Sequence, residues 1–160
     1  MLNKAIEIAV QAHNGQVDKA GHPYIGHPLR VMNMGITDEE KILGILHDVV
    51  EDSEWTFDQL TAVGFSMEII DALRCLTKLS ESEPYDQFIQ RIQTNPLAVK
   101  VKINDLTDNM DIRRLTHISE QDVKRLQKYL KAYRLLLKEP TSFTNTNQVE
   151  HPTAYQSDPQ

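Results

Sequence analysis

The sequence holds a single cysteine and no long apolar run, and each absence excludes a class of protein. Cys75 alone cannot form an internal disulfide, which agrees with a reducing compartment. No apolar stretch approaches the roughly 20 residues of a membrane-spanning helix. The N-terminus is too short and too mixed in character for a signal peptide. We therefore expect a cytoplasmic protein that has no membrane partner.

Positive charge is also scarce in this chain. Its 160 residues include 17 Lys and Arg against 23 Asp and Glu, which gives a formal net charge of −6. A protein that coats nucleic acid needs a basic patch, so nucleic acid is not an expected partner. An anionic small molecule is still compatible with this charge, because a bound divalent cation reverses the electric field locally.

Strand alternation and internal repeats are missing as well, and apolar residues recur at helical spacing instead. The length suffices for one domain with a core. This pattern predicts an all-α fold in a single domain over residues 1–139. The Thr-, Asn- and Gln-rich segment 140–160 is predicted to be a flexible polar tail. A first helix is predicted from residue 2 to near Asn14 and Gly15. Capping residues and prolines predict further helices that start near Pro28, Thr37, Thr56, Ser66, Pro84, Pro96 and Ser119.

The stretch "GILHDVVED" places polar side chains inside an otherwise apolar helical pattern. The helix that carries it is predicted to run to about Glu51. Positions i, i+1, i+4 and i+5 share one side of a helix, so His47, Asp48, Glu51 and Asp52 would form one polar wall. One interpretation is a buried histidine beside solvated carboxylates. The other is a metal site, since histidine and aspartate both bind divalent ions.

Two further residues are candidate partners for that pair. His27 lies in "YIGHP", at a loop-to-helix junction where functional residues often lie. Asp105 lies in "KINDLTDNMD", at an apolar helical run, where a buried carboxylate is costly unless it is paired or bound to a metal. With His47 and Asp48 they make a mixed imidazole–carboxylate set suited to Mn, Fe or Zn. From spacing alone this set remains one of two interpretations, because His-Asp dipeptides are common by chance.

Three stretches in a fixed order carry a family resemblance: "AHNGQVDKAGHPYIGHPLRV", "GILHDVVED" and "VKINDLTDNM". Together they resemble the HD-domain hydrolases of the RelA/SpoT type, in particular the stand-alone small alarmone hydrolases. The resemblance extends from about residue 5 to residue 138. It implies removal of the 3′-pyrophosphate from guanosine tetra- and pentaphosphate (ppGpp and pppGpp), which yields GDP or GTP. It implies hydrolysis alone, because the chain has no room for the synthetase domain of bifunctional relatives.

The resemblance also assigns roles to single residues. Glu51 and Asp52 match the acidic pair that handles the attacking water, and we expect Glu51 to accept the proton and Asp52 to position it. Lys19 matches a basic residue near the nucleotide, with an ordinary exposed lysine as the alternative. Asn109 matches an asparagine near the ribose, with a plain helix cap as the alternative. The family's metal ligands, usually for manganese with Zn or Fe also possible, correspond to His27, His47, Asp48 and Asp105.

Three positions depart from the family pattern. Asp18 and Leu106 stand where the family has arginine, and Asp108 stands where it has histidine. An acid at position 18 repels phosphates or removes a platform for the base. Two other functions therefore stay open: hydrolysis of a phosphate on another nucleotide, such as the 2′-phosphate of NADPH, and nucleotide binding without turnover. The intact acidic pair argues against the last of these.

Several other polar residues receive weaker predictions. Tyr24 is expected to pack beneath its loop, although it could stack on a base. Lys102 and Arg30 are candidate phosphate contacts. Solvated helix faces are expected for Arg113, Arg114, Lys124 and Arg125.

Overall fold

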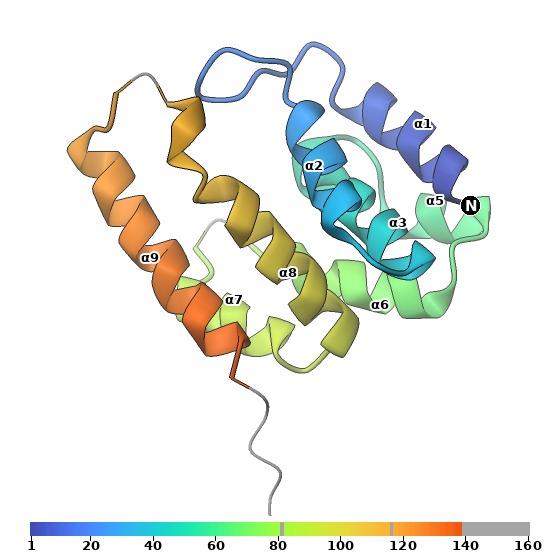
Figure 1. Cartoon of the computed structure of the whole chain (residues 1–160). Coiled ribbons are helices and arrows are strands. Elements are labelled where there is room, and N and C mark those ends of the chain that lie inside the picture. Colours follow the sequence, from blue (N-terminus) through green and yellow to red (C-terminus); the bar gives the residue numbers. More distant parts are fainter. Residues whose placement is uncertain (81, 116, 139–160) are drawn as a thin grey trace, which may run out of the picture.

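The computed structural model describes residues 1–80, 82–115 and 117–138 (Figure 1). Within these ranges the chain is helical, and its one β-type pairing is an isolated bridge between Val17 and Pro23. The all-α prediction is confirmed, whereas the predicted tail lies outside the described residues. The elements are α1 (Leu2–Ala12), α2 (Gly26–Met34), α3 (Asp38–Leu46), α4 (Val49–Asp52), α5 (Phe57–Val63), α6 (Met67–Leu76), α7 (Tyr85–Ile92), α8 (Pro96–Asn109), the 3₁₀ helix η1 (Ile112–Arg114) and α9 (Glu120–Leu136).

Helix α3 lies at the centre of the packing and contacts α1, α2, α6 and α8. Its apolar residues Leu43, Ile45 and Leu46 are fully buried. Helix α8 lies between the pair α2 and α3 and the helix α9, which is on the opposite side of the molecule from α1 (Figure 1). In the described residues, no helix combines the length and the apolar character needed to traverse a bilayer.

The predicted continuous helix up to Glu51 is wrong, because the chain breaks at His47 and Asp48. Helix α3 ends at Leu46, and α4 starts at Val49. Asp48 occupies the N-cap position of α4, yet its side chain makes no capping hydrogen bond. Its carboxylate Oδ2 instead lies 3.0 Å from His47 Nε2. At this break the two side chains point toward each other.

Gly44 allows the backbones of α2 and α3 to approach closely. A Cβ atom at this position would lie 3.1 Å from both the Cα and the N of Met32. Because α2 begins next to His27 and α3 ends just before His47, this close approach also sets how near the two imidazoles lie.

Replacing Gly44 with alanine is therefore expected to destabilise the fold. The overpacking costs about 1–3 kcal/mol, and the better helix propensity of alanine, worth up to about 1 kcal/mol, offsets only part of it. Urea unfolding followed by circular dichroism measures the difference. Gly26→Ala is the matched control, since only the end of the flexible Arg30 side chain lies near its Cβ position. A Gly44→Ala variant as stable as this control would contradict the role given to Gly44.

Candidate metal centre

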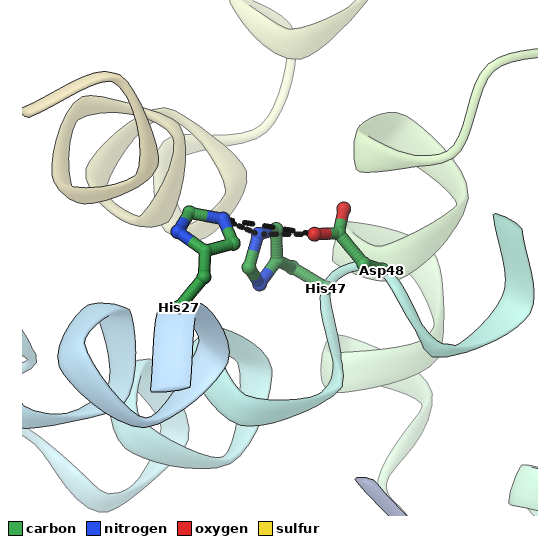
Figure 2. Close-up of side chains that lie close together, drawn as sticks. All are labelled: His27, His47 and Asp48. Atoms are coloured by element: carbon green, nitrogen blue, oxygen red, sulfur yellow. Dashed lines mark hydrogen bonds and ion pairs between the residues drawn. The ribbon is translucent and has the colours of Figure 1, made fainter. Parts of the chain in front are cut away.

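Four side chains from three separate segments converge on one point. His27 comes from α2, His47 and Asp48 from the break after α3, and Asp105 from α8. His47 Nε2 lies 3.2 Å from His27 Nε2 and 3.0 Å from Asp48 Oδ2 (Figure 2). Asp105 Oδ1 lies 3.1 Å from His27 Nε2 and 3.6 Å from His47 Nε2. The structure thus brings together the four residues that the sequence suggested as ligands.

Each imidazole is oriented by a hydrogen bond from its other nitrogen. His47 Nδ1 donates to the carbonyl oxygen of Gly44, and His27 Nδ1 donates to Asp108 Oδ2, both at 2.7 Å. Carbonyl and carboxylate oxygens only accept, so the hydrogen of each neutral ring is on Nδ1 and Nε2 presents a lone pair. Lone pairs and carboxylate oxygens therefore face one another, and a divalent cation satisfies such a set.

The electrostatics of the cluster favour bound positive charge. His27, His47 and Asp105 are each no more than 6% exposed. Burial lowers the pKa of His47, but Asp48 and Asp105 outweigh it and hold that pKa well above its ordinary value. Burial raises the pKa of Asp105, but Lys102 and the two imidazoles outweigh it and hold that pKa well below its ordinary value. Both carboxylates thus stay ionised and create a potential that attracts a cation.

Asp108 holds a position that the sequence did not identify as part of the site. Besides accepting from His27, its carboxylate accepts from Arg30 Nε at 2.6 Å and from Arg30 Nη2 at 3.0 Å. Arg30, a candidate phosphate contact, thus binds a carboxylate instead. The available signal was spacing: Asp108 lies three residues after Asp105, on the same face of α8.

The carboxylate of Asp105 is surrounded by donors from its own helix. Lys102 Nζ lies 2.6 Å from Oδ2, and Asn109 Nδ2 donates to Oδ1. Lys102 is therefore paired with Asp105 rather than available as a simple phosphate contact. The alternative that Asn109 merely caps the helix does not hold, because Met110 is the C-cap residue of α8.

Tyr24 packs against two imidazole rings and also forms a hydrogen bond in the site. Its ring centre lies 5.0 Å from that of His13 and 5.7 Å from that of His27, which agrees with the predicted packing role. Its hydroxyl also donates to Asp48 Oδ2 at 2.6 Å, a contact the sequence did not reveal. Burial and the neighbouring Asp48 raise the pKa of Tyr24, so the phenol keeps its proton and remains a donor.

The acidic pair divides into two different environments. Glu51 accepts from Lys78 Nζ at 3.0 Å and from the Lys78 backbone N–H at 3.2 Å. The Asp52 carboxylate makes no hydrogen bond or ion pair with any residue that the structure describes, while its backbone oxygen accepts from Gln16 Nε2. Partial burial, followed by the charges of Asp48 and Glu51, raises the pKa of Asp52. Asp52 is therefore the carboxylate better suited to take up a proton.

A hollow of about 340 Å³ opens beside His27 and is large enough to accept a small ligand. Lys19 and Asn109, the two predicted substrate contacts, both line it. Asp18 also lines it, but its Oδ1 accepts from the backbone N–H groups of Ala20 and His22, so its charge organises the loop that carries Lys19. The remaining described lining residues are Val17, Ala20, Tyr24, His27, Asp111, Leu115, Arg125 and Tyr129.

Two of the three departures from the family pattern thus have structural roles. Asp18 holds its loop, and Asp108 holds His27. Leu106, the third, is 1% exposed and belongs to the hydrophobic core. The expected solvation of Arg113 holds, because its side chain is 87% exposed, whereas the side chain of Arg114 lies outside what the structure describes.

Comparison with known proteins finds relatives that are named as GTP pyrophosphokinases or as guanosine-3′,5′-bis(diphosphate) 3′-pyrophosphohydrolases. A GTP pyrophosphokinase of Myxococcus xanthus is 32% identical over 145 residues, which cover 79% of this chain and 18% of the relative. A guanosine-3′,5′-bis(diphosphate) 3′-pyrophosphohydrolase of Haemophilus influenzae is 34% identical over 116 residues, which cover 64% of this chain and 17% of the relative. The chain therefore spans less than a fifth of the length of these relatives. No family model matches the chain.

A solved structure shares the fold. It is that of a metazoan ortholog of SpoT that hydrolyzes ppGpp, and it superposes with a TM-score of 0.72 over 86% of this chain and 85% of its own. The sequence identity is 20%, so this likeness concerns the arrangement of the helices.

Proposed function

We propose, from the premise that the chain belongs to the HD-domain family of the RelA/SpoT type, that it is a metal-dependent 3′-pyrophosphohydrolase of guanosine tetra- and pentaphosphate. The observation that carries the proposal is the set of four acceptor atoms beside a hollow that reaches His27. The products would be GDP or GTP and pyrophosphate. We place the reaction in the cytoplasm, as the single cysteine suggests.

We propose manganese as the ion, held by His27, His47, Asp48 and Asp105. Two imidazole nitrogens and two carboxylate oxygens suit Mn, and the same donors accept Zn or Fe. Such an ion, when bound, lowers the pKa of water and stabilises negative charge on a phosphoryl oxygen. Tyr24 keeps Asp48 oriented, and Asp108 does the same for His27.

The chain's own residues handle the proton and the nucleotide. Asp52 accepts the proton of the attacking water, because its pKa is raised and its carboxylate forms no hydrogen bond or ion pair with the residues that the structure describes. Glu51, held by Lys78, contributes the neighbouring negative charge that supports this pKa. This assignment reverses the roles that the sequence suggested for the two acids. Lys19 and Asn109 contact the nucleotide from the walls of the hollow.

Asp108→Asn is expected to weaken Mn²⁺ binding by about 10–100-fold, the usual effect of removing the partner of a ligating histidine. The amide loses the charge that holds His27 and the paired contact with Arg30. Isothermal titration of the metal-free protein with Mn²⁺ measures the change. Asp111→Asn is the matched control, because Asp111 follows α8 and its carboxylate accepts hydrogen bonds from Arg113. Equal affinity of the Asp108→Asn variant and the wild type would rule out this role.

Turnover of a nucleotide panel tests the proposed function itself. The protein is incubated with ppGpp, GDP or NADPH, with Mn²⁺ or after exhaustive chelation, and the products are separated by anion exchange. We expect ppGpp to yield GDP and pyrophosphate when Mn²⁺ is present, and no product after chelation. Phosphate release from NADPH without ppGpp cleavage would move the assignment to the other substrate, and tight binding without any cleavage would make the chain a binding module.

A further inference from the structure

Helix α9 carries an apolar stripe that the rest of the described chain leaves partly uncovered. Val123, Leu130 and Leu137 are 44%, 40% and 54% exposed. Leu126 and Tyr133, which lie between them along the helix, are only partly buried. Within the described residues, α9 forms one edge of the molecule, with α8 beside it (Figure 1). A continuous row of exposed apolar side chains marks a protein–protein contact.

The stripe repeats with the spacing of a seam between two helices. Its five positions are separated alternately by three and four residues, as the a and d positions of a coiled coil are. At about 100° per residue, the stripe lies about a third of a turn from Ala132 and Leu136, which are buried in the core. A second helix can therefore pack along the stripe without displacing the core contacts of α9.

An apolar groove of about 380 Å³ widens the stripe near the start of α9. Part of its wall comes from outside that helix: Met110 directly follows α8, and Ile118, which precedes α9, is 50% exposed. None of the described lining residues is charged, and they are Met110, Ile118, Val123, Leu126, Gln127 and Leu130. Such a groove suits the apolar side chains of a protein better than it suits a charged small molecule.

The polar flank of the stripe has charges of opposite sign at its two ends. Glu120, Gln127 and Arg134 lie seven residues apart, on the side of the stripe that faces away from the core. Among the residues that the structure describes, neither Glu120 nor Arg134 forms an ion pair, whereas Asp122 does. The lysines of this helix lie on its far side, away from the stripe: Lys124, Lys128 and Lys131. The charges that a partner helix would meet are therefore one acid and one base, placed symmetrically about Gln127.

A second copy of α9 in the antiparallel orientation matches both the apolar and the charged positions. A twofold axis sets residue i of one copy against residue j of the other, and j against i. In one register, Leu126 of each copy packs against Leu130 of the other. The same register brings Glu120 of each copy beside Arg134 of the other, so opposite charges meet at both ends of the seam. A parallel pairing would instead set Arg134 against Tyr129 and leave both charges unpaired.

We propose that the stripe over residues 123–137 is the interface of a homodimer, in which two copies of α9 pack antiparallel and Glu120 pairs with Arg134 across the twofold axis. This interface does not depend on the proposed function, because none of its residues belongs to the metal centre or lines the hollow beside His27. The seam is only about 21 Å long, which is short for a stable interface. We therefore expect a dissociation constant of about 1–100 µM.

Sedimentation velocity of the 160-residue chain, over about 1–500 µM, tests the association. We expect a monomer at the lowest concentration and a dimer at the highest. Leu130→Gln should weaken the dimer at least about tenfold, since a leucine in a symmetric interface is lost twice. Leu135→Gln is the matched control, because Leu135 is similarly exposed, at 38%, and lies on the opposite side of α9 from the stripe. Circular dichroism verifies that both variants keep the helical fold.

Reversal of the flanking charges tests the antiparallel orientation. Glu120→Arg and Arg134→Glu should each weaken the dimer at least about threefold, because like charges then meet at both ends of the seam. The double variant Glu120→Arg/Arg134→Glu should restore the association, since opposite charges face each other again.

A wild-type chain that stays monomeric up to the highest concentration would overturn the homodimer. A monomer whose resistance to urea falls in Leu130→Gln but not in Leu135→Gln would assign the stripe to another segment of its own chain. Equal dimerisation of these two variants, or a double charge variant that associates no better than the single ones, would contradict the antiparallel seam. Turnover of ppGpp enters none of these outcomes, so the proposed function stands or fails separately.

Discussion

Asp105→Asn is expected to lower kcat/KM on ppGpp by more than about 100-fold, because even the partners of metal ligands are worth 10–100-fold. The substitution removes the charge of a carboxylate whose Oδ1 lies 3.1 Å from His27 Nε2. An amide keeps the size of the side chain and an oxygen that can accept from Lys102. Asparagine is the better test than alanine, since alanine would leave the largely buried Lys102 without its partner, which destabilises the fold and confuses a loss of metal with a loss of structure.

The measurement combines steady-state kinetics with Mn²⁺ titration and urea unfolding of the same preparation. We expect the loss of activity to accompany a loss of metal affinity, with the helical fold retained. Asp86→Asn serves as the control, because Asp86 forms an exposed pair with Lys131 away from the cluster. An Asp105→Asn variant that stays folded and keeps full activity after chelation would remove the basis of the metal centre.

Asp52→Asn is expected to lower kcat by about 10²–10⁴-fold, the usual contribution of a positioned general base. Mn²⁺ affinity should be unchanged, because Asp52 is not one of the four converging side chains. Glu51→Gln should cost less, about tenfold, since Glu51 is held by Lys78 and acts through the charge it places beside Asp52.

Rapid-quench measurements with saturating Mn²⁺ distinguish the two acids, because they report the chemical step apart from metal and substrate binding. Glu54→Gln, an exposed acid in the same segment, is the control. A larger loss in Glu51→Gln than in Asp52→Asn would restore the assignment that the sequence suggested and refute the one drawn from the environments of the two side chains.

Local chemistry explains which parts of the fold could be predicted. Thr37, Ser66 and Ser119 each accept a hydrogen bond from a backbone N–H of the helix they start, and all three starts were predicted from residue type. The end of α3 was not, because the break at His47 contains no proline or glycine. It depends on contacts with Tyr24 and His27, which lie twenty or more residues away in sequence.

The same distinction between local residue type and contacts distant in sequence applies to the site. The four converging residues were suggested from residue type and, above all, from the order of three motifs. The partners that orient them were not, since the contact between Asp108 and His27 joins α8 to α2 and leaves no short-range pattern. Arg125, predicted to lie on a solvated helix face, is only 17% exposed and lines the hollow beside His27. The sequence of α9 has the pattern of a surface helix, and the packing of α9 against α8 that brings Arg125 to this hollow leaves no local pattern.

The spread of the converging residues over the chain has a consequence for biosynthesis. Both imidazoles lie within the first 47 residues, whereas Asp105 belongs to α8, the last long helix before α9. A nascent polypeptide that has not yet exposed α8 outside the ribosome would hold three of the four donors and could not complete the centre. Catalysis would therefore arrive late in translation, after most of the helical domain has left the exit tunnel.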